Sequence, residues 1–181
     1  MDRNNQSKMT IAAMKGNVMA FAQDQHGSRF IQQKLEFATD DEKQLIFHEI
    51  SNDLIMLMND VFGNYVIQKL FDFGLPQHKV LLVNSLRGNV LKLALQMYGC
   101  RVVQKAIETV DDSVRSELVD ELRGHVEECV RDQNGNHVIQ KCIEHVPPNK
   151  VDFIIGSFYG KVLVLAKHPY GCRVVQGVLE F

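Results

Sequence analysis

Phe62-Gly63-Asn64-Tyr65-Val66-Ile67-Gln68-Lys69 is the stretch that decides the fold, because the same pattern occurs five times along the chain. The other copies are His26–Gln33, Tyr98–Lys105, Asn134–Lys141 and Tyr170–Gly177. Their glycines stand at positions 27, 63, 99, 135 and 171, and their glutamines at 32, 68, 104, 140 and 176, so every step is 36 residues. A fixed period of this length is typical of a solenoid, in which one structural unit stacks on the next.

Composition places the chain among ordinary globular proteins. Of its 181 residues, 45% are hydrophobic and 23% are charged, which is a usual balance for a packed domain. No apolar run approaches the roughly 18 residues of a membrane span, and the N-terminus lacks the apolar segment of a secretory signal. The four cysteines form no Cys-x-x-Cys pair, so we expect reduced thiols in a cytoplasmic protein, with no metal and no cofactor.

Each repeat is expected to contain three helices: a short helix, the helix that carries the motif, and an outer helix. The outer helix begins at signals such as the capping box Thr39-Asp40-Asp41-Glu42. The motif helices are expected near residues 28–38, 64–73, 100–110, 136–146 and 172–181. Apolar residues four apart in the motif predict one buried helix face. This column contains Ile31, Leu35, Ile67, Phe71, Val103, Ile107, Ile139, Ile143, Val175 and Leu179.

The turn ahead of each short helix has a residue suited to left-handed backbone angles. Gly16, Gly88, Gly124 and Gly160 occupy this position in four repeats, and Asn52 occupies it in the second. Glycine and asparagine both tolerate this conformation. We therefore expect the chain to turn at all five positions.

Five repeats account for nearly the whole chain, so we expect a single repeat domain over residues 1–181. The chain stops at the end of the fifth motif helix, without an outer helix, and we therefore expect a fragment of a longer array. Terminal repeats of a solenoid need a polar cap. The uncapped face of the fifth repeat is expected to be apolar and to support end-to-end self-association.

Three residues of each motif form a polar trio on the motif helix. The first follows the glycine, the second comes next, and the third is the glutamine, which lies one helical turn beyond the first. The trios are Ser28/Arg29/Gln32, Asn64/Tyr65/Gln68, Cys100/Arg101/Gln104, Asn136/His137/Gln140 and Cys172/Arg173/Gln176. The glutamine is constant, the first residue alternates between asparagine and a smaller group, and the second is flat or cationic.

This trio chemistry fits a nucleobase. Two small polar side chains can hydrogen-bond to a base edge, and an Arg, Tyr or His beside them can stack on the base face. A net charge of −2 does not exclude nucleic acid, because a stripe of base-reading residues can occupy one face of a near-neutral solenoid. The trios are therefore candidate RNA-binding residues.

The segments Gly63–Lys69 and Gly99–Lys105, which read GNYVIQK and GCRVVQK, resemble the Pumilio (PUF) repeat, and the resemblance covers nearly the whole chain. It implies an all-α fold, a right-handed α-solenoid (crescent) of three-helix repeats whose motif helices line a concave RNA-binding face. Repeats of this family read one base each with two or three side chains. Family members usually carry eight repeats, and these five resemble the first five.

The resemblance also implies a base for each repeat. Asn with Gln reads uracil, which applies to Asn64/Gln68 and Asn136/Gln140. Cys or Ser with Gln reads adenine, which applies to Ser28/Gln32, Cys100/Gln104 and Cys172/Gln176. Arg29, Tyr65, Arg101, His137 and Arg173 are expected to stack on the bases, and Lys69, Lys105 and Lys141 to contact phosphates. Family RNA runs antiparallel to the protein, so the expected target is 5′-AUAUA-3′.

The expected partners are single-stranded mRNA 3′-UTR elements, with protein co-repressors on the convex face. The expected role is post-transcriptional control of mRNA through translational repression or decay. The alternative is a protein-binding α-solenoid of the armadillo or HEAT type without RNA readout. The periods of such solenoids are about 40 to 47 residues, and they give no reason for the alternating first residue. No catalytic triad spacing or phosphate loop recurs, so we do not expect an enzyme.

Overall fold

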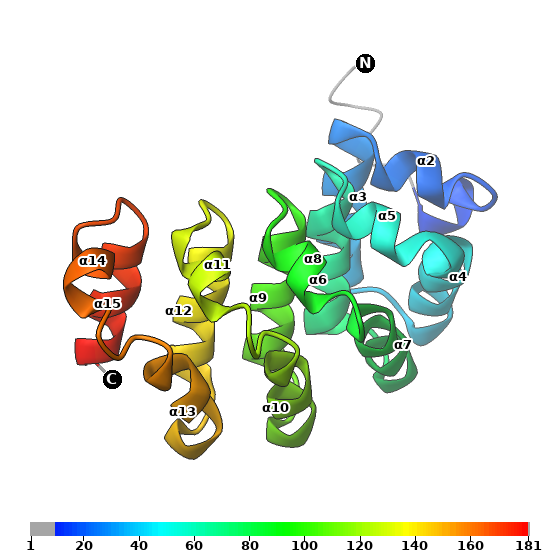
Figure 1. Ribbon diagram of the computed structural model, residues 1–181. Coiled ribbons are helices and arrows are strands. Elements are labelled where there is room, and N and C mark those ends of the chain that lie inside the picture. Colours follow the sequence, from blue (N-terminus) through cyan, green and yellow to red (C-terminus); the bar gives the residue numbers. More distant parts are fainter. Residues whose placement is uncertain (1–9, 181) are drawn as a thin grey trace. The chain divides into compact units, whose positions relative to one another are not determined.

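The computed structural model describes residues 10–180, and every regular element in that range is a helix (Figure 1). The chain divides into two compact units, with the boundary between Leu82 and Val83. The single repeat domain expected for residues 1–181 stays a prediction. Both units repeat the expected order of short helix, motif helix and outer helix.

The first unit contains the motif helices α3 and α6. Its elements are η1 (Ile11–Met14), α2 (Val18–Ala22), α3 (Gln25–Leu35), α4 (Asp40–Ile50), η2 (Ser51–Asp53), α5 (Leu54–Met58), α6 (Gly63–Phe73) and α7 (Pro76–Leu86), which continues into the second unit. Helix α3 packs against both its own short helix α2 and the next motif helix α6. The outer helix α4 contacts α2 and η1.

The second unit contains the motif helices α9, α12 and α15. Its elements are α8 (Val90–Ala94), α9 (Gly99–Thr109), α10 (Asp112–Asp120), α11 (Val126–Arg131), α12 (Gly135–His145), α13 (Pro148–Gly156), α14 (Val162–Ala166) and α15 (Gly171–Glu180). Helix α12 lies between α9 and α15 and packs against both (Figure 1). Each motif helix also packs on the short helix before it. The motif helices are therefore neighbours, although 36 residues separate them in the sequence.

The motif helices begin earlier than predicted. Helices α6, α9, α12 and α15 each include the repeated glycine, and α3 starts at Gln25 and ends at Leu35 rather than near residue 38. Helix α3 ends early for a local reason, because Thr39 and Glu42 form the predicted capping box and start α4 at Asp40. The early start depends on a side chain upstream of the glycine, described with the functional site.

The predicted buried column is confirmed in the first repeats and is wrong in the last. Its members up to Ile139 are fully or almost fully buried. Ile143 and Val175 are only half-buried, and Leu179 is 82% exposed. In the described residues α15 contacts α11, α12 and α14 but has no outer helix of its own. Burial of this column therefore depends on neighbouring helices as well as on helical spacing.

The left-handed turn is confirmed at the glycines and is wrong at Asn52. Gly16, Gly88, Gly124 and Gly160 have φ values of 83°, 73°, 85° and 73°, where a Cβ atom is disfavoured. No described residue other than glycine has positive φ. At Asn52 the chain instead forms the 3-10 helix η2 and runs directly into α5.

The repeated motif glycines allow the short helix to approach the motif helix closely. An added Cβ would stand 2.4 Å from the Phe21 carbonyl oxygen at Gly27 and 2.8 Å from the Cys129 carbonyl oxygen at Gly135. Both distances are well below the roughly 3.5 Å of an ordinary contact. Glycine is therefore needed at these positions for packing, and the backbone there has no positive φ.

Arg115 links three helices of the second unit. Its guanidinium donates to the carbonyl oxygens of Ile107 at 2.6 Å and Val110 at 2.7 Å, at the end of α9. It also donates to the His145 carbonyl oxygen at the end of α12, at 3.2 Å. These carbonyls have no partner within their own helices. One side chain of α10 thus caps two neighbouring motif helices.

Candidate functional site

In the first, second, fourth and fifth repeats, a side-chain acceptor three residues ahead of the repeated glycine starts the motif helix, a feature that was not predicted from the sequence. The Asp60 carboxylate accepts from the backbone N–H groups of Phe62 at 2.9 Å and Gly63 at 2.7 Å. Asp24 and Asp132 accept in the same way from the residues two and three positions later. These N–H bonds hold the pKa of Asp24 below its ordinary value. The spacing of these aspartates, which are 36 and 72 residues apart, was the signal that could have revealed them.

His168 takes the place of this aspartate in the fifth repeat. Its Nδ1 accepts from the backbone N–H groups of Tyr170 and Gly171, both at 3.2 Å. Because Nδ1 is an acceptor, the neutral ring carries its proton on Nε2. His168 therefore helps to start the motif helix α15.

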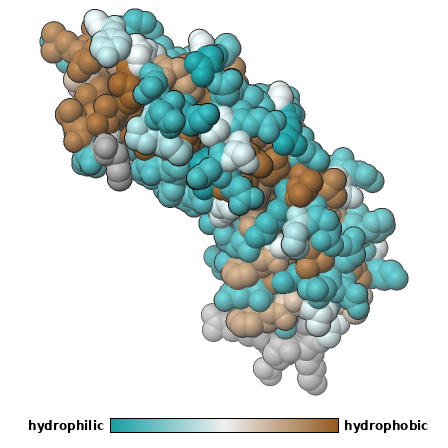
Figure 2. Space-filling model, turned by 90° about the horizontal axis from the view of Figure 1, so that it is seen from below, coloured by the Kyte–Doolittle hydropathy of each residue, from teal (hydrophilic) through white to brown (hydrophobic). Residues whose placement is uncertain are grey.

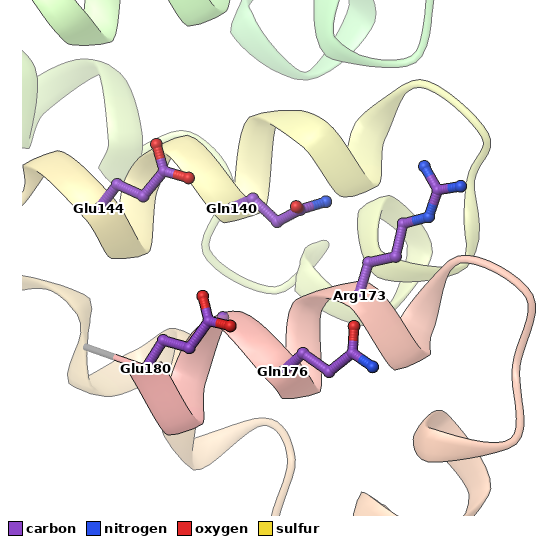
Figure 3. Close-up of a pocket in the computed structure, with 6 residues that line it drawn as sticks. Gln140, Glu144, Arg173, Gln176 and Glu180 are labelled. Atoms are coloured by element: carbon purple, nitrogen blue, oxygen red, sulfur yellow. The ribbon is translucent and has the colours of Figure 1, made fainter.

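The glutamines predicted to read bases occupy equivalent places on the motif helices. Gln32, Gln68, Gln104 and Gln140 are half-buried, and Gln176 is exposed. Figure 3 shows Gln140 on α12 and Gln176 on the facing α15, with the Arg173 side chain extending from α15 toward the α12 side. These three residues line a hollow of about 190 Å³ between the two helices. The hollow brings together predicted readers from two repeats.

The other end of this hollow is acidic. Glu144 and Glu180 line it one helical turn beyond the glutamines (Figure 3). Every repeat has an acidic residue at this position: Glu36, Asp72, Glu108, Glu144 and Glu180. This acidic column was not predicted from the sequence. The hollow therefore has a cationic end at Arg173 and an anionic end at the two glutamates.

The first residue of the trio lies deeper than expected. Ser28, Asn64, Cys100 and Asn136 are buried, and only Cys172 is half-exposed. The Cys100 thiol donates to the Met97 carbonyl oxygen at 3.5 Å, and burial raises its pKa, so it stays protonated. In each repeat this side chain is less exposed than the glutamine, and its predicted contact with a base edge stays a prediction.

The predicted stacking residues lie at the surface. Arg29, Arg101 and Arg173 are exposed, Tyr65 is 39% exposed, and His137 is half-buried. Burial lowers the pKa of His137, and the positive charges of Arg173 and Arg101 lower it further. In the second unit the cations of two repeats therefore act on the ring of the repeat between them. At neutral pH that ring is uncharged and offers a flat aromatic face.

The lysines predicted to contact phosphates already have partners. Lys141 pairs with Glu108 at 2.8 Å and Glu144 at 2.9 Å, and these hydrogen bonds raise its pKa. Lys105 pairs with Glu108 at 3.6 Å. Lys69 lies 5.0 Å from the centre of the Phe73 ring. Any phosphate contact by Lys105 or Lys141 competes with a carboxylate, and the role stays a prediction.

Other chemistries have little support in the described part of the chain. No group of three metal-ligating side chains lies together between residues 10 and 180. Cys100, Cys129, Cys142 and Cys172 are free thiols, and burial raises the pKa of Cys129 to about 12. Within the same residues, no helix has both the length and the apolar character that crossing a bilayer requires.

Comparison with protein families gives a match over most of the chain. The model for the "Pumilio-family RNA binding repeat" matches residues 17–51, 54–87, 89–123, 125–156 and 161–181. Pumilio homolog 1 of Xenopus laevis is 57% identical over 57 residues, which are 31% of this chain and 5% of that protein. The mRNA-binding protein puf3 of Schizosaccharomyces pombe is 51% identical over 49 residues, which are 27% of this chain and 7% of that protein.

Solved structures match over nearly the full chain. The Puf3 RNA-binding domain, bound to a recognition sequence of the Cox17 RNA 3′ UTR, has a TM-score of 0.96 and 52% identity, covering 99% of this chain and 51% of that one. PUF-8 in complex with PBE-RNA has a TM-score of 0.90 and 40% identity, covering 99% of this chain and 53% of that one. The chain thus spans about half of these solved chains. The matches confirm the expected all-helical solenoid fold.

Proposed function

Because the chain belongs to the Pumilio family of RNA-binding repeat proteins, we propose that it binds single-stranded RNA sequence-specifically, with one base per repeat. The observation that carries this proposal is the hollow between α12 and α15, where the glutamines of two repeats and Arg173 converge. Similar solved domains hold RNA, namely a Cox17 3′-UTR element and PBE-RNA. The proposed target is 5′-AUAUA-3′, read antiparallel to the protein. The proposed setting is post-transcriptional control of mRNA 3′-UTRs in the cytoplasm, without catalysis.

The charges along the motif helices favour phosphates at one end of each proposed base slot. Helix N-termini carry partial positive charge. The exposed Arg101 and Arg173 lie in the first turns of α9 and α15, and Arg29 lies in the second turn of α3. The acidic column lies about two turns further along. We therefore expect an RNA backbone to lie nearer the arginine end, farther from the carboxylates.

The expected affinity is modest. Stacking contributes roughly 1–3 kcal/mol per base, so five bases give about 5–15 kcal/mol before costs. Association costs at least about 4 kcal/mol in lost freedom. With a net charge of −2, the phosphate contribution is small. We expect a Kd in the micromolar range.

Fluorescence anisotropy with labelled pentamers tests the proposal. The chain is expected to bind AUAUA and to bind CCCCC at least about tenfold more weakly, because each cytosine is mismatched at its hydrogen-bonding edge. An Arg173→Ala variant should weaken binding to AUAUA through lost stacking at the first base. Equal affinity for the two RNAs would show that the trios do not read bases in this chain.

Proteins are proposed as second partners, on the convex face as co-repressors and at the fifth repeat as another copy of the chain. Exposed apolar side chains gather at the end formed by α14 and α15 (Figure 2). They include Tyr159, Val162, Leu163, Val164 and Leu179, which are 51–82% exposed. A second copy that covers this patch would remove its apolar area from water. Sedimentation velocity over a concentration series should show dimers, and a monomer at the highest concentrations would exclude this association.

A further inference from the structure

The residue three places ahead of the motif glycine is titratable near neutral pH in the fifth repeat alone. It is aspartate at positions 24, 60 and 132, glutamine at position 96 and histidine at position 168. The three aspartates accept from the backbone N–H groups two and three residues later. His168 Nδ1 accepts from the corresponding groups of Tyr170 and Gly171, both at 3.2 Å. Of these three residue types, only histidine ordinarily changes its charge between pH 5 and 8.

Protonation turns the acceptor of His168 into a donor. The neutral ring accepts at Nδ1 and carries its proton on Nε2, so an added proton goes to Nδ1. The Nδ1–H group would then face two backbone N–H groups, and the ring would place a positive charge beside the partially positive N-terminus of α15. The start of α15 therefore keeps its acceptor above the pH range in which histidine titrates and loses it as the pH falls through that range.

The segments on either side of His168 bring cations near its ring. Helix α14 has no charged side chain, Lys167 follows it, and Arg173 lies in the first turn of α15. The carboxylate of α15 belongs to Glu180, at the opposite end of the helix. The Tyr170 ring lies 5.9 Å from the His168 ring, centre to centre. None of these groups favours a protonated His168 ring.

The other two helices packed against α15, which are α11 and α12, offer the ring no acidic partner among the residues that the structure describes. Their glutamates pair with other groups: Glu127 with Arg131 and Lys161, Glu128 with His125, and Glu144 with Lys141. The carboxylate of Asp132, ahead of α12, accepts from the backbone of its own repeat. The other titratable side chains on these two helices are Cys129, His137, Cys142 and His145.

We infer that His168 is an acid-sensitive switch in the fifth repeat, because protonation of its ring removes the acceptor that starts α15. Arg173 lies two residues beyond Gly171, in the turn that this acceptor holds. Acid therefore loosens the arginine end of the fifth repeat, whereas aspartate keeps its charge and its acceptor over the same range. The consequence for RNA rests on the proposed RNA binding: the contact of the fifth repeat weakens in acid, and those of the repeats started by aspartate persist.

Hydrogen exchange of single backbone amides tests the switch without RNA. NMR gives protection factors, which correct each exchange rate for its intrinsic pH dependence, at pH 7.5 and 5.0. Protection of the Tyr170 and Gly171 amides is expected to fall about fivefold at the lower pH, the usual effect of losing a helix cap. The Gly135 amide, bonded to Asp132, is the internal control and should change less than about twofold. Equal protection of Gly171 at the two pH values would overturn the inference.

Two substitutions at position 168 bracket the native behaviour. His168→Asp introduces the residue of three other repeats and should keep high protection of Gly171 at both pH values. His168→Gln introduces the residue of the third repeat, where Gln96 accepts from neither Tyr98 nor Gly99 in the described part of the chain, and should give low protection at both. A pH dependence in His168→Asp as large as that of the native chain would show that another group is responsible.

The reciprocal substitution, Asp132→His, should transfer the switch to the fourth repeat. Its Gly135 amide is expected to lose protection about fivefold between pH 7.5 and 5.0, as Gly171 does in the native chain. Constant protection of Gly135 in this variant would contradict the proposed mechanism. Circular dichroism at both pH values verifies that each variant is folded.

Fluorescence anisotropy with AUAUA separates the switch from the proposed function. Between pH 7.5 and 5.0 the Kd of the native chain is expected to rise at least about threefold more than that of His168→Asp, because fewer chains have an ordered fifth repeat. Comparison with His168→Asp removes the contributions of the other histidines. Equal rises would overturn the coupling of His168 to RNA binding. A fall in Gly171 protection in a chain that binds AUAUA at neither pH would instead refute the proposed function and leave the switch intact.

Discussion

Replacement of Gly135 by alanine is expected to destabilise the second unit by about 1–2 kcal/mol. The new Cβ would stand 2.8 Å from the carbonyl oxygen and 2.9 Å from the Cα atom of Cys129 in the short helix α11. Both are backbone atoms, so α11 must move away from α12. Overpacking of this kind costs about 1–3 kcal/mol, and the better helix propensity of alanine offsets at most about 1 kcal/mol of it.

Gly177→Ala is the matched control, because Gly177 also lies in a motif helix and an added Cβ there meets nothing within 4 Å. This variant is expected to be more stable than the native chain by about 0.5–1 kcal/mol. Urea unfolding followed by circular dichroism at 222 nm measures both changes. If Gly135→Ala were as stable as the native chain, close approach of α11 would not explain the repeated glycine.

Two further predictions concern Arg115 and His78. Arg115→Met should destabilise the second unit by about 2–4 kcal/mol in urea unfolding, because three carbonyl oxygens lose a charged donor. The control is Arg123→Met, which should cost under about 1 kcal/mol because the Arg123 side chain is 59% exposed. Equal losses of stability in the two variants would contradict the capping role of Arg115. His78 is buried against Phe47 and bonded to Gln44, and burial, helped by the charge of Lys43, lowers its pKa. Folding therefore disfavours the protonated His78 ring, so its contribution to stability is full above the ordinary pKa of about 6.5 and falls as the pH drops below that value. The urea midpoint of unfolding should decrease between pH 7.5 and 5.5, and it should decrease less in His78→Gln. An equal decrease in His78→Gln would show that His78 is not the cause of the pH dependence.

The sequence by itself determined the repeat, the helix order and the polar trios. These features depend on spacing along one chain segment, such as the four residues between Asn136 and Gln140 or between Ile31 and Leu35. Helical geometry converts such spacings into a common side of the helix without any knowledge of neighbours. The same holds for the left-handed Gly16, Gly88, Gly124 and Gly160, whose preference is intrinsic to glycine. The repeat, the helix order and the left-handed glycines were therefore confirmed, and base reading by the trios stays a prediction.

Only the tertiary structure decided how deep each side chain lies and what it bonds. Leu179 was predicted to be buried and is exposed, because burial needs a second helix beside it. Lys141 was expected to be available to phosphate, but Glu108 of the preceding motif helix pairs with it.

The hydrogen bonds of Asn136 also depend on its surroundings, because its side-chain amide donates to carbonyl oxygens of the turn before α12. A helical period reports on which side of a helix a residue lies. Its hydrogen-bond partners depend on atoms that the period does not describe, including those of segments 36 residues away that folding brings beside it.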